Sequence, residues 1–207
     1  MKKGFTLVEM LVVIGIIAAL IAASLGGYSA VTKAAEKARG RDLVQQVAMA
    51  LATMYEKSGG EWPPAIAKVG ERGGQLDEQA AYALVSNDEG TYYLTLQASG
   101  GKLIGYDRFG VLDPWGLAIM KKGGANVTRS AVTKGAGSDF DHLLWFAVDT
   151  DGDGVISGAQ VGGESIDVRA TAIVWGAGKD GKMEKYSLGR KKDDLYSWSD
   201  GQTKKVK

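Results

Sequence analysis

The feature that most constrains this chain is an apolar segment at residues 5–25 in which Glu9 is the one charged side chain. As an α-helix rising about 1.5 Å per residue, this segment reaches roughly 30 Å, the thickness of the hydrocarbon core of a bilayer. Lys2 and Lys3 precede it, and positive charge on that side favours a cytoplasmic amino terminus. We therefore expect a helix that spans a membrane over residues 5–25 and leads into an exported domain.

Glu9 is unusual in such a segment, because an ionised carboxylate near the middle of a bilayer costs on the order of 2.5 to 3.5 kcal/mol. A cut between Gly4 and Phe5 would create an ammonium at Phe5, and the free N–H groups of the first helical turn would add positive dipole beside it. In a helical stack of subunits, the ammonium can also come from a neighbouring copy. We expect Glu9 to pair with such an amino terminus.

Residues 2–9, Lys-Lys-Gly-Phe-Thr-Leu-Val-Glu, resemble the class III prepilin leader of type IV pilins and type II secretion pseudopilins. The resemblance implies cleavage after Gly4 by a prepilin peptidase and methylation of the new amino terminus at Phe5. It also implies that Glu9 sets the register of subunits during filament assembly. Two alternatives are a plain single-pass anchor and a secretory signal peptide cleaved near Ser29-Ala30, although a signal peptide's apolar region usually covers only about 7 to 15 residues.

The sequence divides into a predicted leader at residues 1–4, a long helix at residues 5–58 and an exported, β-rich globular domain at residues 59–207. The helix is expected to span a membrane over residues 5–25 and to be amphipathic over residues 28–58. In the amphipathic part, apolar residues recur every three or four positions, so one face should pack on the globular domain. This stripe consists of Val44, Val47, Ala48, Leu51, Met54 and Tyr55.

Gly26 and Gly27 lie in the middle of the predicted helix, where each glycine costs about 1 kcal/mol relative to alanine. Two interpretations stay open at this point. The helix unwinds locally in a filament, or the small residues let neighbouring helices approach closely. Many type IV pilins carry a proline in this region, and this sequence does not.

Composition excludes several classes of protein. The formal net charge is +1, so neither a basic surface nor an acidic tail dominates, and no nucleic-acid partner is expected. The chain has no cysteine, so its exported domain is stabilised by its core, or by its core together with a metal ion, and not by disulfides. His142 is the single histidine, and the sequence has no Gly-x-Ser-x-Gly elbow and no Walker A loop. We expect His142 to be structural and the protein not to be an enzyme.

After the long helix, residues 75–85 have a helical composition, and short strand-like runs follow. These runs are rich in β-branched or aromatic residues and are bounded by Gly, Asp or Asn. They cover residues 92–96, 118–120, 143–148 and 170–175. The order predicts an α+β fold in which a long amino-terminal helix packs on a mainly antiparallel sheet. The resemblance to pilins implies the pilin fold.

The tetrapeptide Asp113-Pro114-Trp115-Gly116 is similar to the turn that opens a β-hairpin in the major pseudopilins of type II secretion. Pro114 fixes φ at the second position of such a turn, and Gly116 tolerates a positive φ. Trp115 is expected to anchor the turn on the core. We predict a structural role for this motif and no chemical one.

Residues 175–182 and 193–198 resemble the glycine- and aspartate-rich loop and the closing segment of the same pseudopilins, in which the loop binds calcium. The resemblance implies Asp180, Asp193 and Asp194 as side-chain ligands, with backbone carbonyls completing a set of hard oxygens. This sequence departs from the pattern by adding positive charges beside the proposed site. They are Lys185, Arg190, Lys191 and Lys192.

A second group of carboxylates, Asp149, Asp151 and Asp153, has the alternating spacing of a calcium-binding loop, and glycine follows at position 154. Position twelve of that loop is Gln160, where an EF-hand has a bidentate glutamate, so a true EF-hand is not expected. Glu164 or Asp167 are candidates to complete the shell. The alternative is a solvated acidic hairpin turn without a cation.

Together these features predict a structural subunit of a type IV pilus-like filament, most specifically a type II secretion pseudopilin that acts in protein export. Expected partners are other copies of the chain in a helical filament, a prepilin peptidase, an inner-membrane assembly platform and minor pilins or pseudopilins. The chain would cross the inner membrane once before assembly and then lie in a periplasmic or cell-surface filament. The alternatives are a surface type IV pilin for adhesion or motility, and a membrane-tethered, calcium-dependent binding module.

Overall fold

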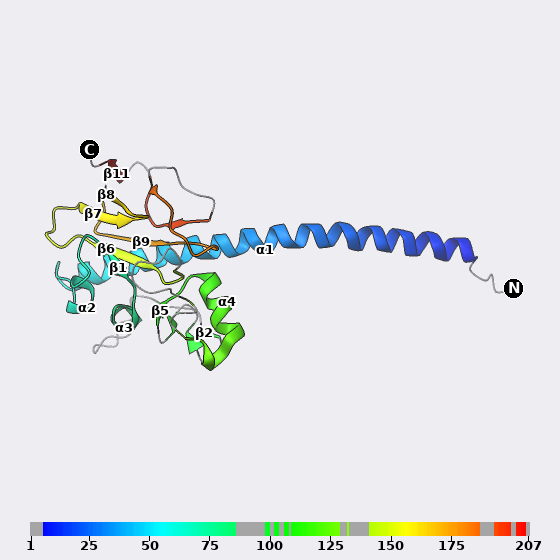
Figure 1. The fold of residues 1–207 in the computed structure, drawn as a ribbon, viewed down its shortest axis with the longest axis horizontal. Helices are drawn as coiled ribbons and strands as arrows, with labels where there is room; N and C mark the ends of the chain where they lie inside the picture. The colour runs from blue at the N-terminus through cyan, green and yellow to red at the C-terminus, as the bar shows by residue number, and fades with distance from the viewer. Residues whose placement is uncertain are drawn as a thin grey trace. The chain divides into compact units, whose positions relative to one another are not determined.

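The computed structural model shows an α+β protein with one long amino-terminal helix and antiparallel sheets (Figure 1). It describes residues 6–85, 98–99, 102–103, 106–107, 109–128, 132, 141–186, 193–199 and 202–205. The chain forms two compact units, Met1–Ala38 and Arg39–Lys207. Each unit is considered by itself below.

Helix α1 runs without a break from Leu7 to Lys57 and confirms the single long helix that the sequence predicts. Its path includes Gly26 and Gly27, which are helical in this structure. The helix ends at a pair of glycines, because Gly59 and Gly60 have φ values of 71° and 87°. The N–H of Gly60 donates to the carbonyl of Tyr55 at 3.0 Å, which satisfies one of the last carbonyls of the helix.

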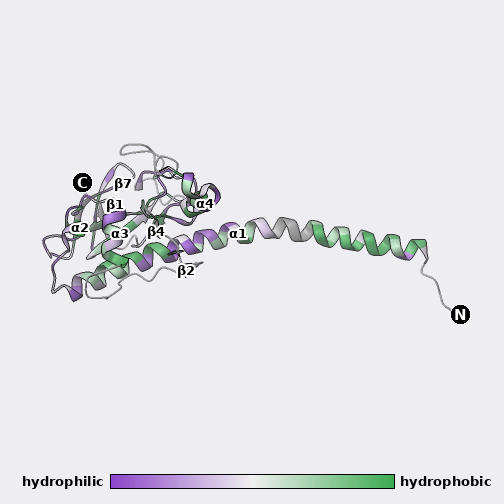
Figure 2. Ribbon diagram, turned by 90° about the horizontal axis from the view of Figure 1, so that it is seen from below, coloured by the Kyte–Doolittle hydropathy of each residue, from purple (hydrophilic) through white to green (hydrophobic). Residues whose placement is uncertain are grey.

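In the first unit, the large apolar side chains of α1 between Leu7 and Ile21 are exposed. Leu7, for example, is 81% exposed and Ile21 is 56% exposed. Figure 2 shows this part of the helix as a mainly hydrophobic stretch. Among the helices that the structure describes, none is both long enough and apolar enough to cross a membrane. The membrane span expected over residues 5–25 stays a prediction.

In the second unit, the remaining turns of α1 supply one wall of the main core. Val44, Val47 and Leu51 are fully buried there and Met54 is 1% exposed, which confirms these four members of the predicted stripe, whereas Ala48 and Tyr55 are half-buried. Burying a valine or leucine side chain contributes about 1.5 to 3 kcal/mol. Gly40 lets Leu195 pack directly on the helix, because a Cβ at this position would lie 2.9 Å from Leu195 Cδ1.

A four-stranded antiparallel sheet covers this face of α1 in the order β1-β6-β9-β10. Its strands are β1 (Gly74–Gln75), β6 (Trp145–Val148), β9 (Ala172–Gly176) and β10 (Leu195–Tyr196). Strands β6 and β9 confirm two predicted strands with small shifts at their ends. Side chains alternate across the sheet, so Phe146 faces the α1 core whereas Ala147 and Trp175 face a second apolar cluster.

The second cluster is covered by a three-stranded antiparallel sheet in the order β11-β8-β7. Its strands are β7 (Ile156–Val161), β8 (Glu164–Val168) and β11 (Thr203–Lys205). The register between β7 and β8 shifts between Ile156 and Ala159, at Gly158 with φ 73°. The sequence did not predict this hairpin, because the bulge interrupts the two-residue alternation that identifies a strand.

The other described elements are short. Two small hairpins are formed by β2 (Ala98–Ser99) with β3 (Lys102–Leu103) and by β4 (Tyr106–Asp107) with β5 (Gly110–Val111). The remaining helices are α2 (Pro64–Ala67), α3 (Glu78–Val85), α4 (Pro114–Gly123) and the 3-10 turn η1 (Gly124–Asn126). Helix α3 confirms most of the helix predicted over residues 75–85, although Gln75 belongs to β1. The strand predicted over residues 92–96 lies outside the described residues.

Two predictions around Asp113 are wrong. The tetrapeptide at residues 113–116 begins helix α4 and does not open a β-hairpin, and residues 118–120 are helical and not a strand. The side chain of Asp113 caps the helix by accepting the N–H of Gly116, with Pro114 at the first helical position. Helix α4 packs on a small cluster, here called the α4 cluster. It consists of Leu112, Val127, Val132 and Leu143.

Candidate functional site

At the amino-terminal end of α1, Thr6 and Glu9 form a reciprocal capping pair. The backbone N–H and the hydroxyl of Thr6 each donate to Glu9 Oε2 at 2.8 Å. The N–H of Glu9 in turn lies 3.3 Å from Thr6 Oγ1, to which it donates. This is the capping-box arrangement, in which two side chains satisfy N–H groups that have no partner inside the helix. Within this unit, the Glu9 carboxylate is therefore satisfied by its own chain.

The capping pair adds a residue that the sequence reasoning missed. The spacing Thr6-x-x-Glu9 is a known signal for a helix start, and it was present in the sequence beside the leader motif. Gly4 and Phe5, the predicted cleavage and methylation residues, lie outside the described residues. The pairing of Glu9 with a new amino terminus stays a prediction, and it would have to replace the bonds from Thr6.

Asp149 organises the loop between β6 and β7. Its side chain is 3% exposed, and its two oxygens accept N–H groups at 2.8 Å, Oδ1 from Gly152 and Oδ2 from Gly154. Both glycines have positive φ, 77° and 81°, which a residue with a Cβ adopts only with strain. The alternating pattern of Asp and Gly thus produces a tight loop with Asp149 at its centre.

The structure brings two of the three predicted aspartates of this loop together with a glutamate from elsewhere. One oxygen each of Glu71, Asp149 and Asp151 lies within 4.8 Å of the others. Glu71 also accepts the N–H of Ser157 at 2.8 Å, so it ties its own segment to β7. Asp153 is outside this group, and its carboxylate accepts the N–H of Val155 at 2.7 Å.

Glu164 and Asp167, which were expected to complete the shell, are not part of the carboxylate group of Glu71, Asp149 and Asp151 among the described residues. Asp167 Oδ1 accepts the N–H of Gly158 at 2.9 Å and so supports the bulge in β7. Sequence reasoning missed Glu71 because helices α3 and α4 and the strands β1 to β6 lie between it and the loop. Only the fold places it beside Asp149. Carboxylate oxygens of this kind are the ligands that calcium prefers.

Asp194 is the most unusual carboxylate of the second predicted site. Its side chain is 6% exposed, and Oδ2 accepts the hydroxyl of Tyr196 at 3.1 Å. Oδ1 is buried and has no hydrogen-bond partner among the residues that the structure describes. The pKa of Asp194 is raised to about 7, chiefly by burial and to a smaller extent by the negative charges of Asp193, Glu184 and Asp180, whereas the hydrogen bond from Tyr196 opposes the shift.

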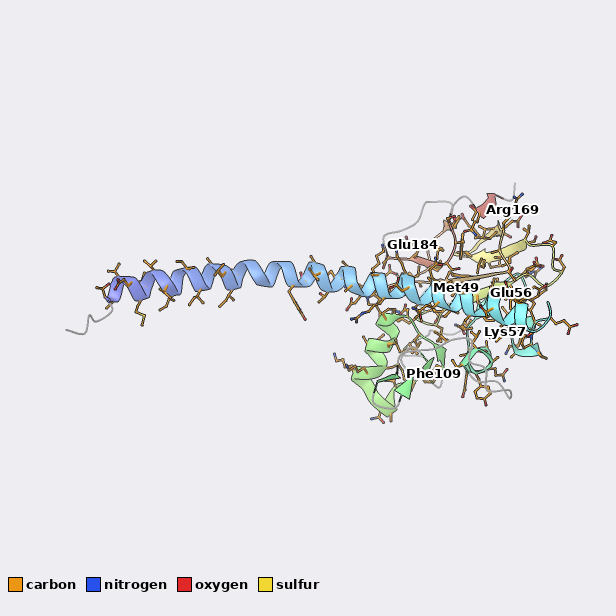
Figure 3. All side chains as sticks on the ribbon, turned by 180° about the vertical axis from the view of Figure 1, so that it is seen from behind. Met49, Glu56, Lys57, Phe109, Arg169 and Glu184 are labelled. Carbon is orange, nitrogen blue, oxygen red and sulfur yellow. The ribbon has the colours of Figure 1, made fainter. Side chains whose placement is uncertain are left out.

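The three predicted ligands of this site, Asp180, Asp193 and Asp194, lie on two segments that the fold holds together. The N–H of Asp180 donates to Asp193 Oδ2 at 3.2 Å. Gly178, with φ 67°, packs so tightly on the backbone of Asp193 that no larger side chain fits there. Glu184, labelled in Figure 3, adds a fourth carboxylate that the sequence reasoning did not include. Of the positively charged residues that the sequence places beside this site, Arg190, Lys191 and Lys192 lie outside the described residues.

The histidine predicted to be structural is buried beside the cap of α4. His142 Nδ1 lies 3.0 Å from Asp113 Oδ2, and Asp113 Oδ1 accepts the N–H of Gly116 at 2.7 Å. Burial raises the pKa of Asp113, and the hydrogen bond with His142 opposes this shift. The pair joins the start of α4 to the segment that leads into β6.

Comparison with known proteins identifies a family motif at the start of the chain. Residues 1–25 match the model of the prokaryotic N-terminal methylation motif, which confirms the predicted prepilin leader. The motif indicates a precursor of the type IV pilin-like kind, a structural class of protein. No curated protein and no solved structure matches the chain.

Proposed function

We propose that this type IV pilin-like precursor is a structural subunit of a helical filament, and specifically a type II secretion pseudopilin that acts in protein export. The match of residues 1–25 to the methylation motif carries the proposal. A prepilin peptidase would cut the chain after Gly4 and methylate Phe5. The mature subunit would lie in the inner membrane through the first part of α1 until an assembly platform adds it to the filament, with minor pilins or pseudopilins as further partners.

The exposed apolar side chains at the start of α1 support assembly through this helix. Leu11, Ile14 and Leu20 are each 63% exposed or more. Burial of apolar surface of this kind stabilises an assembly by about 25 cal/mol for each Å² removed from water. In the filament these side chains would pack against the same segment of other copies, and Glu9 would exchange its bonds from Thr6 for the ammonium of a neighbouring Phe5.

Filament imaging tests this role of Glu9. The chain is co-expressed with a prepilin peptidase and an assembly platform, and filaments are counted by electron microscopy. We expect filaments from the natural chain and from Thr6→Ser, which keeps the hydroxyl of the capping pair, and a strong loss of filaments from Glu9→Ala. Normal filaments from Glu9→Ala would contradict the proposed pairing.

We also propose that the exported domain binds calcium. Two clusters of carboxylates offer hard oxygen ligands, one at Glu71, Asp149 and Asp151, and one around Asp194. The buried oxygen of Asp194 supports the second site, because a cation would satisfy an atom that has no hydrogen-bond partner in the described part of the chain. At the first cluster a bound cation would join segments that are distant in sequence, and at the second it would join two neighbouring segments, so both would stabilise the domain.

Melting curves in calcium and in chelator test the binding. We expect calcium to raise the melting temperature of the natural chain. The variant Asp151→Ala removes one cluster and Asp194→Asn the other, so each should reduce the increase, and together they should remove it. Equal melting of the natural chain in calcium and in chelator would count against both sites.

Two alternative functions are favoured by particular observations. The hairpin of β7 and β8 enlarges the exported domain, which would suit a surface type IV pilin used in adhesion or motility. The carboxylate clusters would suit a membrane-tethered, calcium-dependent binding module. Filaments that stay in the periplasm and are required for secretion of an exported protein would support the pseudopilin, whereas filaments on the cell surface would support the pilin. Absence of any filament would favour the binding module.

A further inference from the structure

The turn after α4 displays the tripeptide Asn126-Val127-Thr128, which neither the leader nor the carboxylate clusters explain. Asn126 is the last residue of η1, and Asn126 and Thr128 are both exposed. Val127 between them is 8% exposed and belongs to the α4 cluster. The tripeptide therefore has a buried middle residue and two exposed polar neighbours.

The backbone of Val127 explains this arrangement. Its φ of −68° and ψ of 126° are extended, and in an extended segment residues i and i+2 share one face while the residue between them points to the other. Because Val127 is buried on one face, Asn126 and Thr128 share the opposite face, on which both residues are exposed. Val127 lies directly against Gly123, which leaves no room for a larger side chain there. The pair is thus presented by a packed turn.

We propose that Asn126 is an acceptor for N-linked glycosylation. Asn-x-Ser/Thr, with x other than proline, is the pattern that oligosaccharyltransferases accept, and it requires the amide and the hydroxyl to be read together on an accessible surface. The only other asparagine of the chain, Asn87, is followed by Asp88 and Glu89 and lacks the hydroxyl. Asn87 is therefore an internal control within the same chain.

The co-substrate is an oligosaccharide linked to a polyprenyl pyrophosphate. In the transfer, Nδ2 of Asn126 attacks C1 of the first sugar, and a C–N bond forms as the C1–O bond to the pyrophosphate breaks. The pyrophosphate leaves with the electron pair of that bond, and the amide nitrogen loses one proton to a base of the transferase. No atom is oxidised or reduced, and the hydroxyl of Thr128 is unchanged.

The inference rests on the export of residues 39–207 that is part of the proposed function, because lipid-linked oligosaccharides are used on the exported side of the membrane. The two proposals can fail separately. Transfer to Asn126 is measured below on purified protein, without a filament, an assembly platform or calcium. Loss of transfer would leave the filament proposal intact, and loss of filaments would leave the acceptor site intact.

The test uses the full chain in detergent, folded, with a purified prokaryotic oligosaccharyltransferase and its lipid-linked oligosaccharide. The free peptide of residues 123–129 is the positive control for the enzyme. Intact-mass spectrometry should show the addition of one glycan per chain. Trypsin, which cuts after Lys122 and Arg129, should place the added mass on the peptide 123–129.

Variants separate the motif from general reactivity. Asn126→Gln and Thr128→Ala should lose the added mass completely, whereas Thr128→Ser should keep it, and matching melting temperatures would show that all three fold. The proposal is overturned if the free peptide is modified but the folded chain is not, if Asn126→Gln still gains a glycan, or if the added mass lies on the peptide that contains Asn87.

Discussion

At the scale of single residues, the carboxylate of Asp194 makes the clearest prediction about pH. Its pKa of about 7 in the folded protein lies above the usual value of 3.8, so the folded state binds more protons between these two values. Stability from this group is present at low pH and is lost as the pH rises through 7, at about 1.4 kcal/mol per pH unit at most. In chelator, the natural chain should therefore lose stability relative to Asp194→Asn between about pH 4 and pH 7.

Urea unfolding at several pH values measures this difference. Calcium should restore the natural chain above pH 7 and leave Asp194→Asn unchanged at this site, because only an ionised carboxylate binds the cation well. Parallel stability curves for the two chains across this pH range would contradict the assignment of a raised pKa to Asp194.

Residues that act locally could be predicted from the sequence, and residues brought in by the fold could not. Asp149 and Asp151 were found because alternating aspartates within one loop carry their own signal. Glu71 was missed because nothing in its neighbourhood indicates that it will meet that loop. The role of Thr6 as a helix cap could have been predicted, because its spacing to Glu9 is a local signal. It was missed because the same residues belong to the leader motif.

At the scale of secondary-structure elements, helix α4 depends on a cap that the sequence analysis assigned to a hairpin. Asp113→Ala removes the hydrogen bonds to Gly116 and His142, and losing buried hydrogen bonds of this kind costs about 1 to 3 kcal/mol. Asp113→Asn is the matched control, because its side-chain oxygen still accepts the N–H of Gly116. We expect a lower melting temperature and less helix by circular dichroism for the alanine variant only. A natural melting temperature for Asp113→Ala would contradict the role of this cap.

The elements that were predicted correctly are those with a long or undisturbed pattern. Helix α1 repeats its apolar stripe over many turns, and β6 and β9 are buried runs of β-branched and aromatic residues. Residues 118–120 were misread because three apolar residues fit a strand as well as a helix turn, and the cap at Asp113 decides between them. The hairpin of β7 and β8 was missed because Gly158 breaks its alternation.

At the scale of the whole molecule, the unit Arg39–Lys207 depends on the core that α1 shares with the sheet. Leu51→Ala should destabilise the domain by about 2 to 5 kcal/mol, because it leaves a cavity at a fully buried position. Met49, two residues earlier and labelled in Figure 3, is 68% exposed, so Met49→Ala should change stability by less than about 0.5 kcal/mol. Urea unfolding measures both. Similar effects from the two variants would contradict the assignment of this helix face to the core.

The central claim is that the chain matures into a filament subunit, and the mass of its amino terminus tests this most directly. After co-expression with a prepilin peptidase, the purified chain should begin at Phe5 and carry one methyl group on its amino nitrogen. The variant Gly4→Ala, which alters the residue before the predicted cut, should impair this processing. A natural chain that retains Met1, or one that is cut near Ser29-Ala30, would contradict the claim.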